Sequence, residues 1–285
     1  MSELTWTGGR ALDRPVLVAA FSGLFDAGSV ATGAIDHLIE HLDATPIARI
    51  DPENFYDFQQ ARPRVELLPE GLRRVVWPEI MAHATSSRPG QRDLVLVTGV
   101  EPHFRWRTFT ELVVEIARRS GAEMIVTLGG NPAQTPHTRP PVVFGSSTNA
   151  QLASRLGLSR PQYQGVTGVL GVLQAALDHG TTPAIAMRVD VPHYAAGDVN
   201  PKGVMALLRH LEHVTGVGTG HAALTPQVAQ WESRLDAAVA DDGDARSYVA
   251  QLEARYDSLT ERQVASGDDI AAELEKFLRE QRGDS

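Results

Sequence analysis

The chain has 285 residues, of which 42% are hydrophobic, a formal net charge of −9 and no cysteine. This length suits one large domain or one domain with an appendage. The missing cysteine excludes disulfides, zinc thiolates and a cysteine nucleophile, and the acidic balance argues against nucleic acid as a partner.

No apolar run reaches the roughly 18 residues of a membrane-spanning helix. The first residues also lack the basic and then apolar pattern of a signal peptide. We therefore expect a cytoplasmic protein that does not contact a membrane. Only Lys202 and Lys276 are lysines, against 24 arginines, a bias that codon usage explains.

The first 225 residues alternate strand-like and helix-like segments. We expect strands at 16–21, 46–50, 93–98, 123–128, 141–145 and 183–189, and helices at 27–42, 107–120, 148–156, 166–179 and 201–214. Two further runs, 64–68 and 72–77, flank Pro69-Glu-Gly71 and predict an antiparallel hairpin. Strands separated by helices of this length predict an α/β fold with a mainly parallel sheet sandwiched by helices.

The composition and the hydrophobic pattern of the chain change after residue 220. From Pro226 onward it carries 14 acidic and 7 basic residues. Apolar residues recur at helical spacing over 231–239, 248–259 and 270–278, which predicts two or three amphipathic helices. We therefore divide the chain into a core, 1–220, and an acidic helical extension, 221–285. The extension is either a cap on the core or an arm toward a partner, and the candidate partner-binding residues on it are Trp231, Tyr248 and Tyr256.

Three of the expected strands each lead into a loop with a Pro-His dipeptide, which brings His103, His137 and His193 to the strand ends. If the strands are parallel neighbours, these loops lie along the carboxyl edge of the sheet, where open α/β sheets bind ligands. Imidazoles beside guanidinium and carboxylate groups can bind an anion or transfer protons. The candidate ligand-binding residues are Asp26, Glu101, His103, Arg105, His137, Arg139 and His193. The alternative is that each histidine caps a backbone carbonyl in a stiffened loop.

The loop after the first strand leaves two interpretations open. It links a buried strand to a helix through two glycines, so backbone N–H groups at the helix start could hold an anion. The side chain of Asp26 or Ser22 could satisfy the same N–H groups instead.

Two other motifs carry less weight. His37-Leu-Ile-Glu-His41 matches an inverted zincin pattern, but its helix looks like a surface helix without a third ligand, so we expect no metal there. Gly216-Val-Gly-Thr-Gly220 has no P-loop lysine after it, and we interpret it as the hinge into the extension. The chain also has no nucleophile elbow of the Gly-x-Ser-x-Gly type, and nothing in it calls for a cofactor.

The order of several short motifs resembles the PAC2 family, the proteasome assembly chaperone 2-like proteins, in its actinobacterial branch. The matching segments are Gly23-Leu-Phe-Asp-Ala-Gly28 with Ala31-Thr-Gly-Ala34, Gly99-Val-Glu-Pro-His-Phe-Arg-Trp106, Leu128-Gly-Gly-Asn-Pro132 with Pro136-His-Thr-Arg-Pro140, Tyr163-Gln-Gly-Val-Thr-Gly168 and Val191-Pro-His-Tyr194. The resemblance implies an α/β core that is similar to phosphorylase and hydrolase folds and is assembled as a homo-oligomer, and it brings no established catalytic residues. It also implies a chaperone-like factor whose candidate partners are proteasome subunits.

Two functions from different classes follow. The first is a protein-binding, proteasome-assembly-chaperone-like factor, which the resemblance, the acidic extension and the missing nucleophile favour. The second is a small-molecule enzyme of phosphorylase or hydrolase type that uses the His and Arg loops on an anionic substrate, which the fold resemblance and the Pro-His loops favour. Some proteasome-docking relatives end in a hydrophobic-Tyr-x tail, whereas this sequence ends Arg-Gly-Asp-Ser. We therefore do not expect docking through such a tail.

Overall fold

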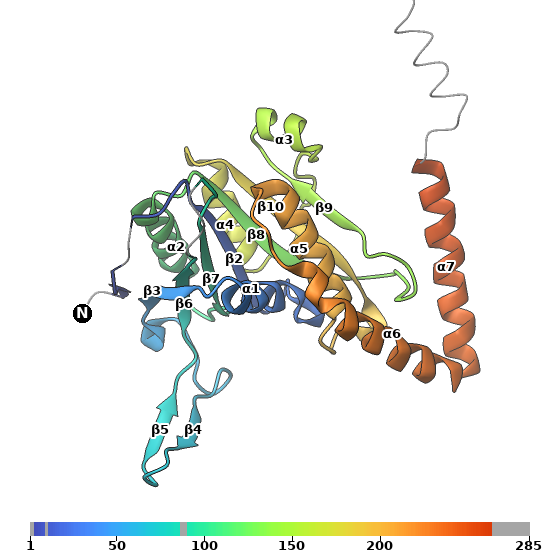
Figure 1. Ribbon diagram of the computed structural model, residues 1–285, viewed down its shortest axis with the longest axis horizontal. Coiled ribbons are helices and arrows are strands. Elements are labelled where there is room, and N and C mark those ends of the chain that lie inside the picture. Colours follow the sequence, from blue (N-terminus) through green and yellow to red (C-terminus); the bar gives the residue numbers. More distant parts are fainter. Residues whose placement is uncertain (1–2, 9–10, 86–89, 264–285) are drawn as a thin grey trace, which may run out of the picture.

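The computed structural model describes residues 3–8, 11–85 and 90–263. An eight-stranded sheet has the order β1-β3-β6-β7-β2-β8-β10-β9, and β4 and β5 form a separate two-stranded sheet (Figure 1). The strands are β1 (Leu4–Trp6), β2 (Val16–Ser22), β3 (Thr45–Ile50), β4 (Arg64–Leu67), β5 (Arg73–Val76), β6 (Ile80–Ala84), β7 (Leu94–Val100), β8 (Met124–Ala133), β9 (Val143–Ser146) and β10 (Ala184–Pro192).

Helices lie between β2 and β3, between β7 and β8 and between β9 and β10, and further helices follow β10. The α-helices are α1 (Val30–His41), α2 (Trp106–Ser120), α3 (Ala150–Leu156), α4 (Val169–Asp178), α5 (Pro201–Thr215), α6 (Thr225–Ala240) and α7 (Gly243–Gln263). Short 3₁₀ helices are η1 (Ala27–Ser29), η2 (Pro52–Asn54), η3 (His193–Ala195) and η4 (His221–Leu224). None of the helices in the described ranges is long and apolar enough to cross a membrane.

The centre of the sheet is parallel. Strands β7, β2, β8 and β10 are neighbours, and each pair among them runs in the same direction. This confirms the predicted α/β class and the predicted parallel neighbours. The flanking strands β6, β3 and β1 on one side and β9 on the other are antiparallel, so the complete sheet is mixed.

Two hydrophobic cores lie on the two faces of the sheet because side chains alternate along each strand. Leu17, Ala19 and Phe21 of β2 join the core that α2 and α4 cover. Val16 and Val18 point the other way, into the core that α1 and α5 cover. Burial on both faces explains why the central strands are continuous apolar runs in the sequence.

The ends of α5 follow from its sequence. The Asn200 side chain accepts a hydrogen bond from the backbone N–H of Gly203 at 2.9 Å, and Pro201 occupies the first helical position, where proline needs no N–H partner. Gly216 ends the helix with a φ of 73°, a left-handed conformation that glycine adopts without strain. The Gly216–Gly220 segment therefore connects α5 to η4 and the helices that follow.

Helix α6 contacts α5, and α7 turns back from the far end of α6, so that α6 and α7 form a V (Figure 1). Asp242, in the turn between them, accepts hydrogen bonds from the N–H groups of Asp244 and Ala245 at 2.8 and 3.1 Å. Two of the predicted helices of the extension are therefore present. The third, predicted at 270–278, lies outside the described residues.

Candidate functional site

The loops that follow the four parallel strands all emerge at one edge of the sheet. Asp26, His103, His137 and His193 follow β2, β7, β8 and β10 respectively, which confirms the predicted placement along the carboxyl edge. Strands lie about 4.8 Å apart, so β7 and β10, with two strands between them, are separated by roughly 14 Å. His103 therefore lies apart from the other two histidines.

The most buried of the candidate side chains is His137, which is 2% exposed. The Tyr194 hydroxyl oxygen lies 2.8 Å from the backbone N of His137 and 2.7 Å from its Nδ1. This oxygen accepts the backbone N–H. The Nε2 of His137 lies 3.0 Å from a carboxylate oxygen of Asp236 on α6, and because an ionised carboxylate only accepts hydrogen bonds, Nε2 is the donor of this pair. Both ring nitrogens of His137 thus have partners within the chain.

Lys202 closes the same site from α5. Its Nζ donates to the carbonyl oxygen of His137 at 2.6 Å and lies 2.6 Å from a carboxylate oxygen of Glu232 on α6. The cavity left among these groups measures about 10 Å³, about the least that holds one water molecule. His137 therefore links the core to α6, and the space enclosed directly among these groups is too small for a substrate.

His193 forms a second link, with α7. Its Nδ1 lies 3.0 Å from the carbonyl oxygen of Ala133. Its Nε2 lies 3.3 Å from the hydroxyl of Tyr248 on α7, and the two rings meet edge to face at 5.7 Å. His193 is exposed, so it remains reachable from solvent although both nitrogens have partners.

Arg139 ties the loop after β8 to α7. Its Nε and a terminal nitrogen each donate to the carboxylate of Asp257 at 2.8 Å, and another lies 3.3 Å from Glu253. Tyr256, between these two acids, donates its hydroxyl hydrogen to the carbonyl of Pro140 at 3.0 Å. The hydrogen bond from Arg139 holds the pKa of Asp257 below its ordinary value of 3.8.

We expect the contact between α7 and the core to weaken in acid. Because the pKa of Asp257 is lowered in the folded chain, its ion pair stabilises fully above about pH 3.8 and is lost as the pH falls through the lowered value. Hydrogen exchange of α7 amides, corrected for intrinsic rates, should therefore accelerate below pH 4 while β8 amides stay protected. In an Arg139→Gln variant α7 should exchange faster at neutral pH and lose this pH dependence. Equal protection of α7 at pH 3 and pH 6 in the wild type would contradict the prediction.

The position of Asp26 decides between the two interpretations of the loop after β2. Its carboxylate accepts hydrogen bonds from the backbone N–H groups of Ala31 and Thr32 at 2.8 and 3.2 Å and from the Thr32 hydroxyl at 2.5 Å. The N–H groups at the start of α1 are thus satisfied by Asp26 itself. Burial raises the pKa of Asp26, and the bonds with Thr32 and Ala31 oppose that rise.

An Asp26→Ala variant should therefore lose stability as a helix-cap variant does. We expect the free energy of unfolding to fall by about 1 to 2 kcal/mol, measured by urea unfolding. Glu40→Ala, on the exposed side of the same helix, is the control and should change it by less than about 0.5 kcal/mol. A loss at Glu40 equal to that at Asp26 would show that helix composition, and not the cap, sets the result.

Glu101 organises a different part of the edge. Its two carboxylate oxygens accept hydrogen bonds from the backbone N–H groups of Leu24 at 3.0 Å and Val169 at 2.5 Å. Val169 is the first residue of α4, and a carboxylate is stabilised at the N-terminus of a helix. Glu101 thus connects the loops after β2 and β7 to the start of α4.

These connected loops expose large apolar side chains, which we call the edge patch. Its members are 51–83% exposed and comprise Leu24, Phe104, Tyr163 and Val166. The Tyr163 hydroxyl donates to the carbonyl of Val166 at 2.7 Å, which fixes the tip of the third loop. An exposed apolar surface of this kind suits contact with another macromolecule.

His103 and Arg105 have structural partners. The His103 Nδ1 accepts the backbone N–H of Asp57 at 3.1 Å, and its ring lies edge to face with Tyr56. Arg105 forms an ion pair with Glu3 beside β1 and lies 5.4 Å from the centre of the Phe55 ring. Both side chains therefore hold the loop after β7 against the neighbouring segments.

The structure thus separates the seven candidate ligand residues into three groups. His137, Arg139 and His193 contact α6 or α7, Glu101 connects the loops that carry the edge patch, and the others support loops or a helix start. Among the predicted partner-binding residues, Tyr248 is 36% exposed, whereas Trp231 is 2% exposed and packs beside His137 at a ring distance of 6.3 Å.

Sequence reasoning missed several residues of the His137 site, namely Tyr194, Lys202, Glu232 and Asp236. Tyr194 directly follows the third Pro-His dipeptide, and Lys202 is one of only two lysines, so the sequence could have pointed to both as site residues. Nothing in the sequence singles out the two acids on α6.

The two histidines of the zincin-like motif contact each other and a loop. Their rings stack at 5.5 Å, and the Nε2 of His37 lies 2.9 Å from the carbonyl oxygen of Thr219. In the described part of the chain, no group of three His, Asp or Glu could hold a metal ion. That these histidines bind no zinc stays a prediction, which a metal analysis of the purified protein tests.

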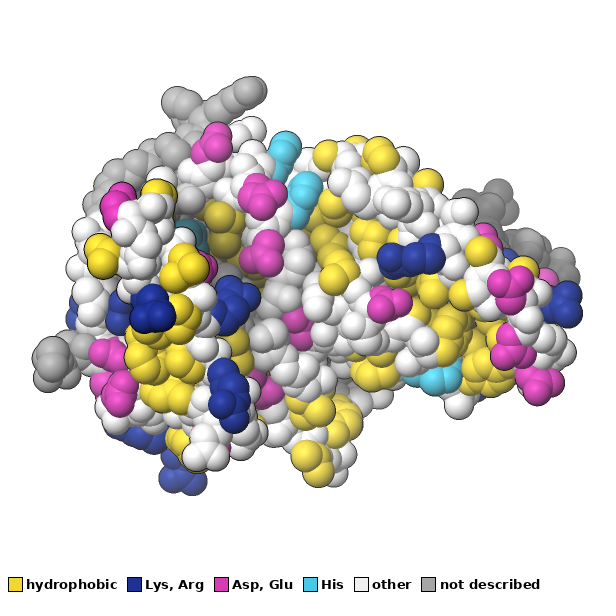
Figure 2. Space-filling model, turned by 90° about the horizontal axis from the view of Figure 1, so that it is seen from below, with side chains coloured by type: hydrophobic (Ala, Val, Ile, Leu, Met, Phe, Trp, Pro, Cys, Tyr) yellow, Lys and Arg dark blue, Asp and Glu magenta, His cyan; other side chains and the backbone are white. Residues whose placement is uncertain are grey.

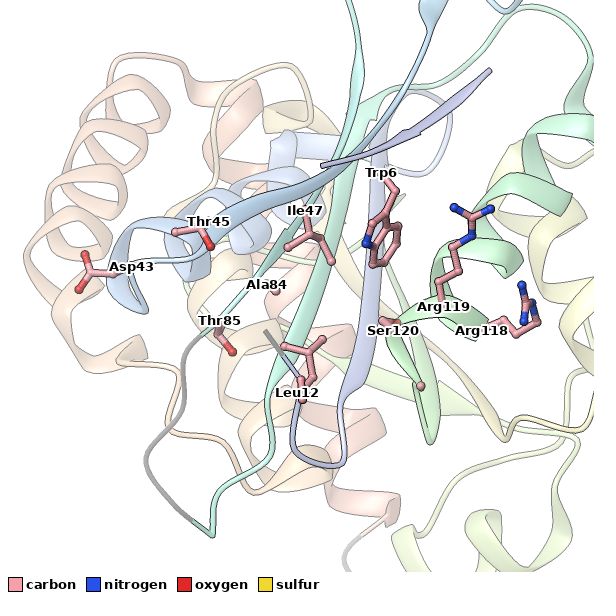
Figure 3. A pocket seen from close by; sticks show the side chains of 12 residues that line it. Trp6, Leu12, Asp43, Thr45, Ile47, Ala84, Thr85, Arg118, Arg119 and Ser120 are labelled. Carbon is pink, nitrogen blue, oxygen red and sulfur yellow. The ribbon is translucent and has the colours of Figure 1, made fainter. Parts of the chain in front are cut away.

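A larger hollow of about 590 Å³ lies at the opposite, amino edge of the parallel strands. Figure 3 shows Trp6 and Ile47 on one side of it and Arg118 and Arg119, at the end of α2, on the other. Both guanidinium groups donate to Glu115 at 2.7 Å, and these bonds lower the pKa of Glu115 to about 2. The arginines beside this hollow are therefore already engaged with a carboxylate.

Comparisons place the chain among known proteins. The model of the PAC2 family matches residues 20–239. The structure is similar to that of a PAC2 family protein from Streptomyces avermitilis, with a TM-score of 0.77 and 38% identity over 82% of this chain and 99% of that one. It is equally similar in sequence, at 38%, to a Mycobacterium tuberculosis proteasome-assembly chaperone homologue, with a TM-score of 0.74 and coverage of 82% and 99%.

More distant structures share the fold alone. An archaeal proteasome activator from Pyrococcus furiosus has a TM-score of 0.66 and 17% identity over 82% of this chain and 97% of that one. No curated protein sequence matches the chain.

Proposed function

Because the chain belongs to the PAC2 family, we propose that it works by binding another protein rather than by turning over a small molecule. In this proposal it is a cytoplasmic homo-oligomer that binds proteasome subunits and needs no cofactor, metal, nucleic acid or membrane. The related Mycobacterium tuberculosis protein, a proteasome-assembly chaperone homologue, supports this choice of partner.

The observation that carries the proposal is the state of the carboxyl edge, where a small-molecule enzyme of this architecture would place its substrate. Both nitrogens of the buried His137 have partners within the chain, and the cavity beside it measures about 10 Å³. The edge patch, in contrast, offers exposed apolar side chains on loops that Glu101 holds in place. In our proposal the edge patch contacts the partner, the core comprises 1–220, and the extension, 221–285, covers the rest of the edge.

Binding to purified proteasome subunits from the same organism tests the proposal. We expect wild-type protein to bind them in a pull-down and in biolayer interferometry, and Phe104→Asp with Tyr163→Asp to weaken binding at least tenfold. Val114→Asp is the matched control, because Val114 is 38% exposed on the outer side of α2 and lies outside the edge patch.

Two results would contradict the proposal. One is no binding by folded wild-type protein, or binding that the double variant leaves unchanged. The other is turnover of a nucleoside, amide or ester that His103→Ala or His193→Ala abolishes without unfolding the chain, which would establish the enzyme alternative.

A further inference from the structure

Strands β4 and β5 form an arm that projects from the body of the molecule (Figure 1). We define the hairpin arm as residues 62–77. Its two strands pair only with each other, as a sheet separate from the main one. At its base the Trp77 ring meets Phe58 edge to face at 4.8 Å. An isolated two-stranded hairpin is marginally stable in water, so an arm of this kind gains stability when another surface covers it.

The arm has one apolar and one charged face. Val65 pairs with Val75 and Leu67 with Arg73, so these residues share a face. The opposite face carries Arg64 and the ion pair of Glu66 with Arg74 at 2.5 Å.

The apolar side of the arm is open to solvent. On this side Val65, Leu67, Val75 and Trp77 are 45–73% exposed. Leu72 is also exposed but points to the other face, because side chains alternate along a strand and Arg73 shares the face of Leu67. The four side chains on the apolar side expose on the order of a few hundred Å², the size of the largest apolar patch on a typical monomer. One side of a stable protein interface buries about 800 Å², so the arm supplies part of such an interface.

Charge indicates which partner covers it. The arm carries four arginines and two glutamates, a net charge of +2, within a chain of net charge −9. Helices α6 and α7, residues 225–263, carry eight acidic and four basic residues. In the turn between them Asp241, Asp242 and Asp244 are all exposed. Figure 2 shows hydrophobic side chains beside Lys and Arg on the arm and, at the other end of the same face, beside Asp and Glu around this turn.

We propose that the hairpin arm docks on a second copy of this chain, with its apolar face against the α6–α7 turn of that copy. The two surfaces differ, so the contact is head to tail and builds a ring if the rotation between copies closes. The inference rests on the homo-oligomer of the proposed function and adds the surfaces that form it. Apolar contact supplies the affinity, and Arg73, which shares the apolar face of the arm, faces the aspartates of the turn and selects the orientation.

A matched pair of variants tests the role of the arm by light scattering at micromolar concentration. Leu67→Asp places a carboxylate opposite Arg73 on the apolar face, and Val76→Asp places one opposite Arg64 on the other face. Each creates a cross-strand Asp–Arg pair that supports the hairpin. We expect Leu67→Asp to raise the dissociation constant of the oligomer at least tenfold and Val76→Asp to leave the oligomer intact, with circular dichroism unchanged in both.

A charge exchange tests the receiving surface. Arg73→Glu should weaken the oligomer, and combining it with Asp241→Arg and Asp244→Arg should restore assembly. Failure to restore it would overturn the α6–α7 turn as the receiving surface.

The outcomes separate this inference from the proposed function. If the wild type and Leu67→Asp form the same oligomer, the arm contact is wrong while the oligomer stands. If Leu67→Asp keeps the oligomer but loses proteasome-subunit binding, the arm binds that partner and the inference is wrong. A wild type that is monomeric would overturn both the inference and the oligomeric part of the proposed function, and subunit binding would then be judged by its own assay.

Discussion

A Trp231→Ala variant should lose about 3 to 5 kcal/mol of unfolding free energy, the usual cost of removing a buried tryptophan side chain. Trp231 is the most buried residue of α6, at 2% exposed, and its ring lies 6.3 Å from that of His137. Without the indole, α6 loses its apolar anchor on the core. The contacts of Asp236 with His137 and of Glu232 with Lys202 should then open as well, because both acids lie on α6.

Urea unfolding measures the loss, and limited proteolysis reports where it acts. We expect cleavage to begin within 225–263 in the variant, under conditions in which the wild type resists. Trp231→Phe should retain most of the stability, because the indole Nε1 has no hydrogen-bond partner among the described residues and phenylalanine therefore loses no hydrogen bond there. Arg234→Ala, exposed on the same helix, is the control and should change stability by less than about 0.5 kcal/mol.

A loss below about 1 kcal/mol in Trp231→Ala would contradict the prediction. It would indicate that the ion pairs and hydrogen bonds of α6 and α7 hold the extension without the tryptophan. Since Asp236 is 62% exposed and exposed ion pairs stabilise little, we expect the apolar contact to dominate.

The central strands of the sheet could be predicted because they are buried on both faces. Strands β7, β2, β8 and β10 are covered by helices on both faces, so their sequences are continuous apolar runs that stand out along the chain. Of the flanking strands, β3 and β9 were predicted, whereas β1 and β6 lack this signature and were not. β1 has only three residues, and β6, Ile80–Ala84, contains a histidine and two alanines. Their pairing is set by neighbouring strands and not by their own composition.

The sequence predicts at which edge of the sheet the candidate residues lie, but not which residues they contact there. The parallel direction of the central strands brings His103, His137 and His193 to one edge of the sheet. The alternation of strands and helices in the sequence predicts this direction. The sequence does not show which helix returns to cover the edge, and the partner of His137 is Asp236, 99 positions away. Nothing in the sequence distinguishes Asp236 from the other acidic residues of the extension. Only the packing of α6 against the core makes it the partner of His137.

Two residues illustrate how one pattern permits two structures. A glycine-rich loop before a helix fits an anion site or an internal cap equally well, and the position of the Asp26 carboxylate decides between them. Lys202 could be explained by codon usage, yet its amino group bonds the carbonyl of His137 and pairs with Glu232. Composition describes how often a residue occurs and not where the fold places it.

A Glu101→Ala variant should lower the unfolding free energy by about 2 to 3 kcal/mol, because it removes two hydrogen bonds to a charged acceptor. It leaves the backbone N–H groups of Leu24 and Val169 without that acceptor. We expect the three loops of the edge patch to move independently in this variant. In the proposed function, binding to proteasome subunits should then fall by at least tenfold, since a loose surface must be ordered again on binding.

Two further variants separate the charge of Glu101 from its position. Glu101→Gln keeps one acceptor oxygen and should show an intermediate loss in both assays. Gly168→Ala leaves Glu101 in the chain but places a methyl group 2.5 Å from its Oε1, closer than real contacts allow, so the carboxylate must move. If Gly168→Ala weakens partner binding as Glu101→Ala does, the placement of the carboxylate organises the edge patch. Unchanged stability and unchanged binding in Glu101→Ala would show that the loops hold their conformation without it, and the edge patch would lose its proposed support.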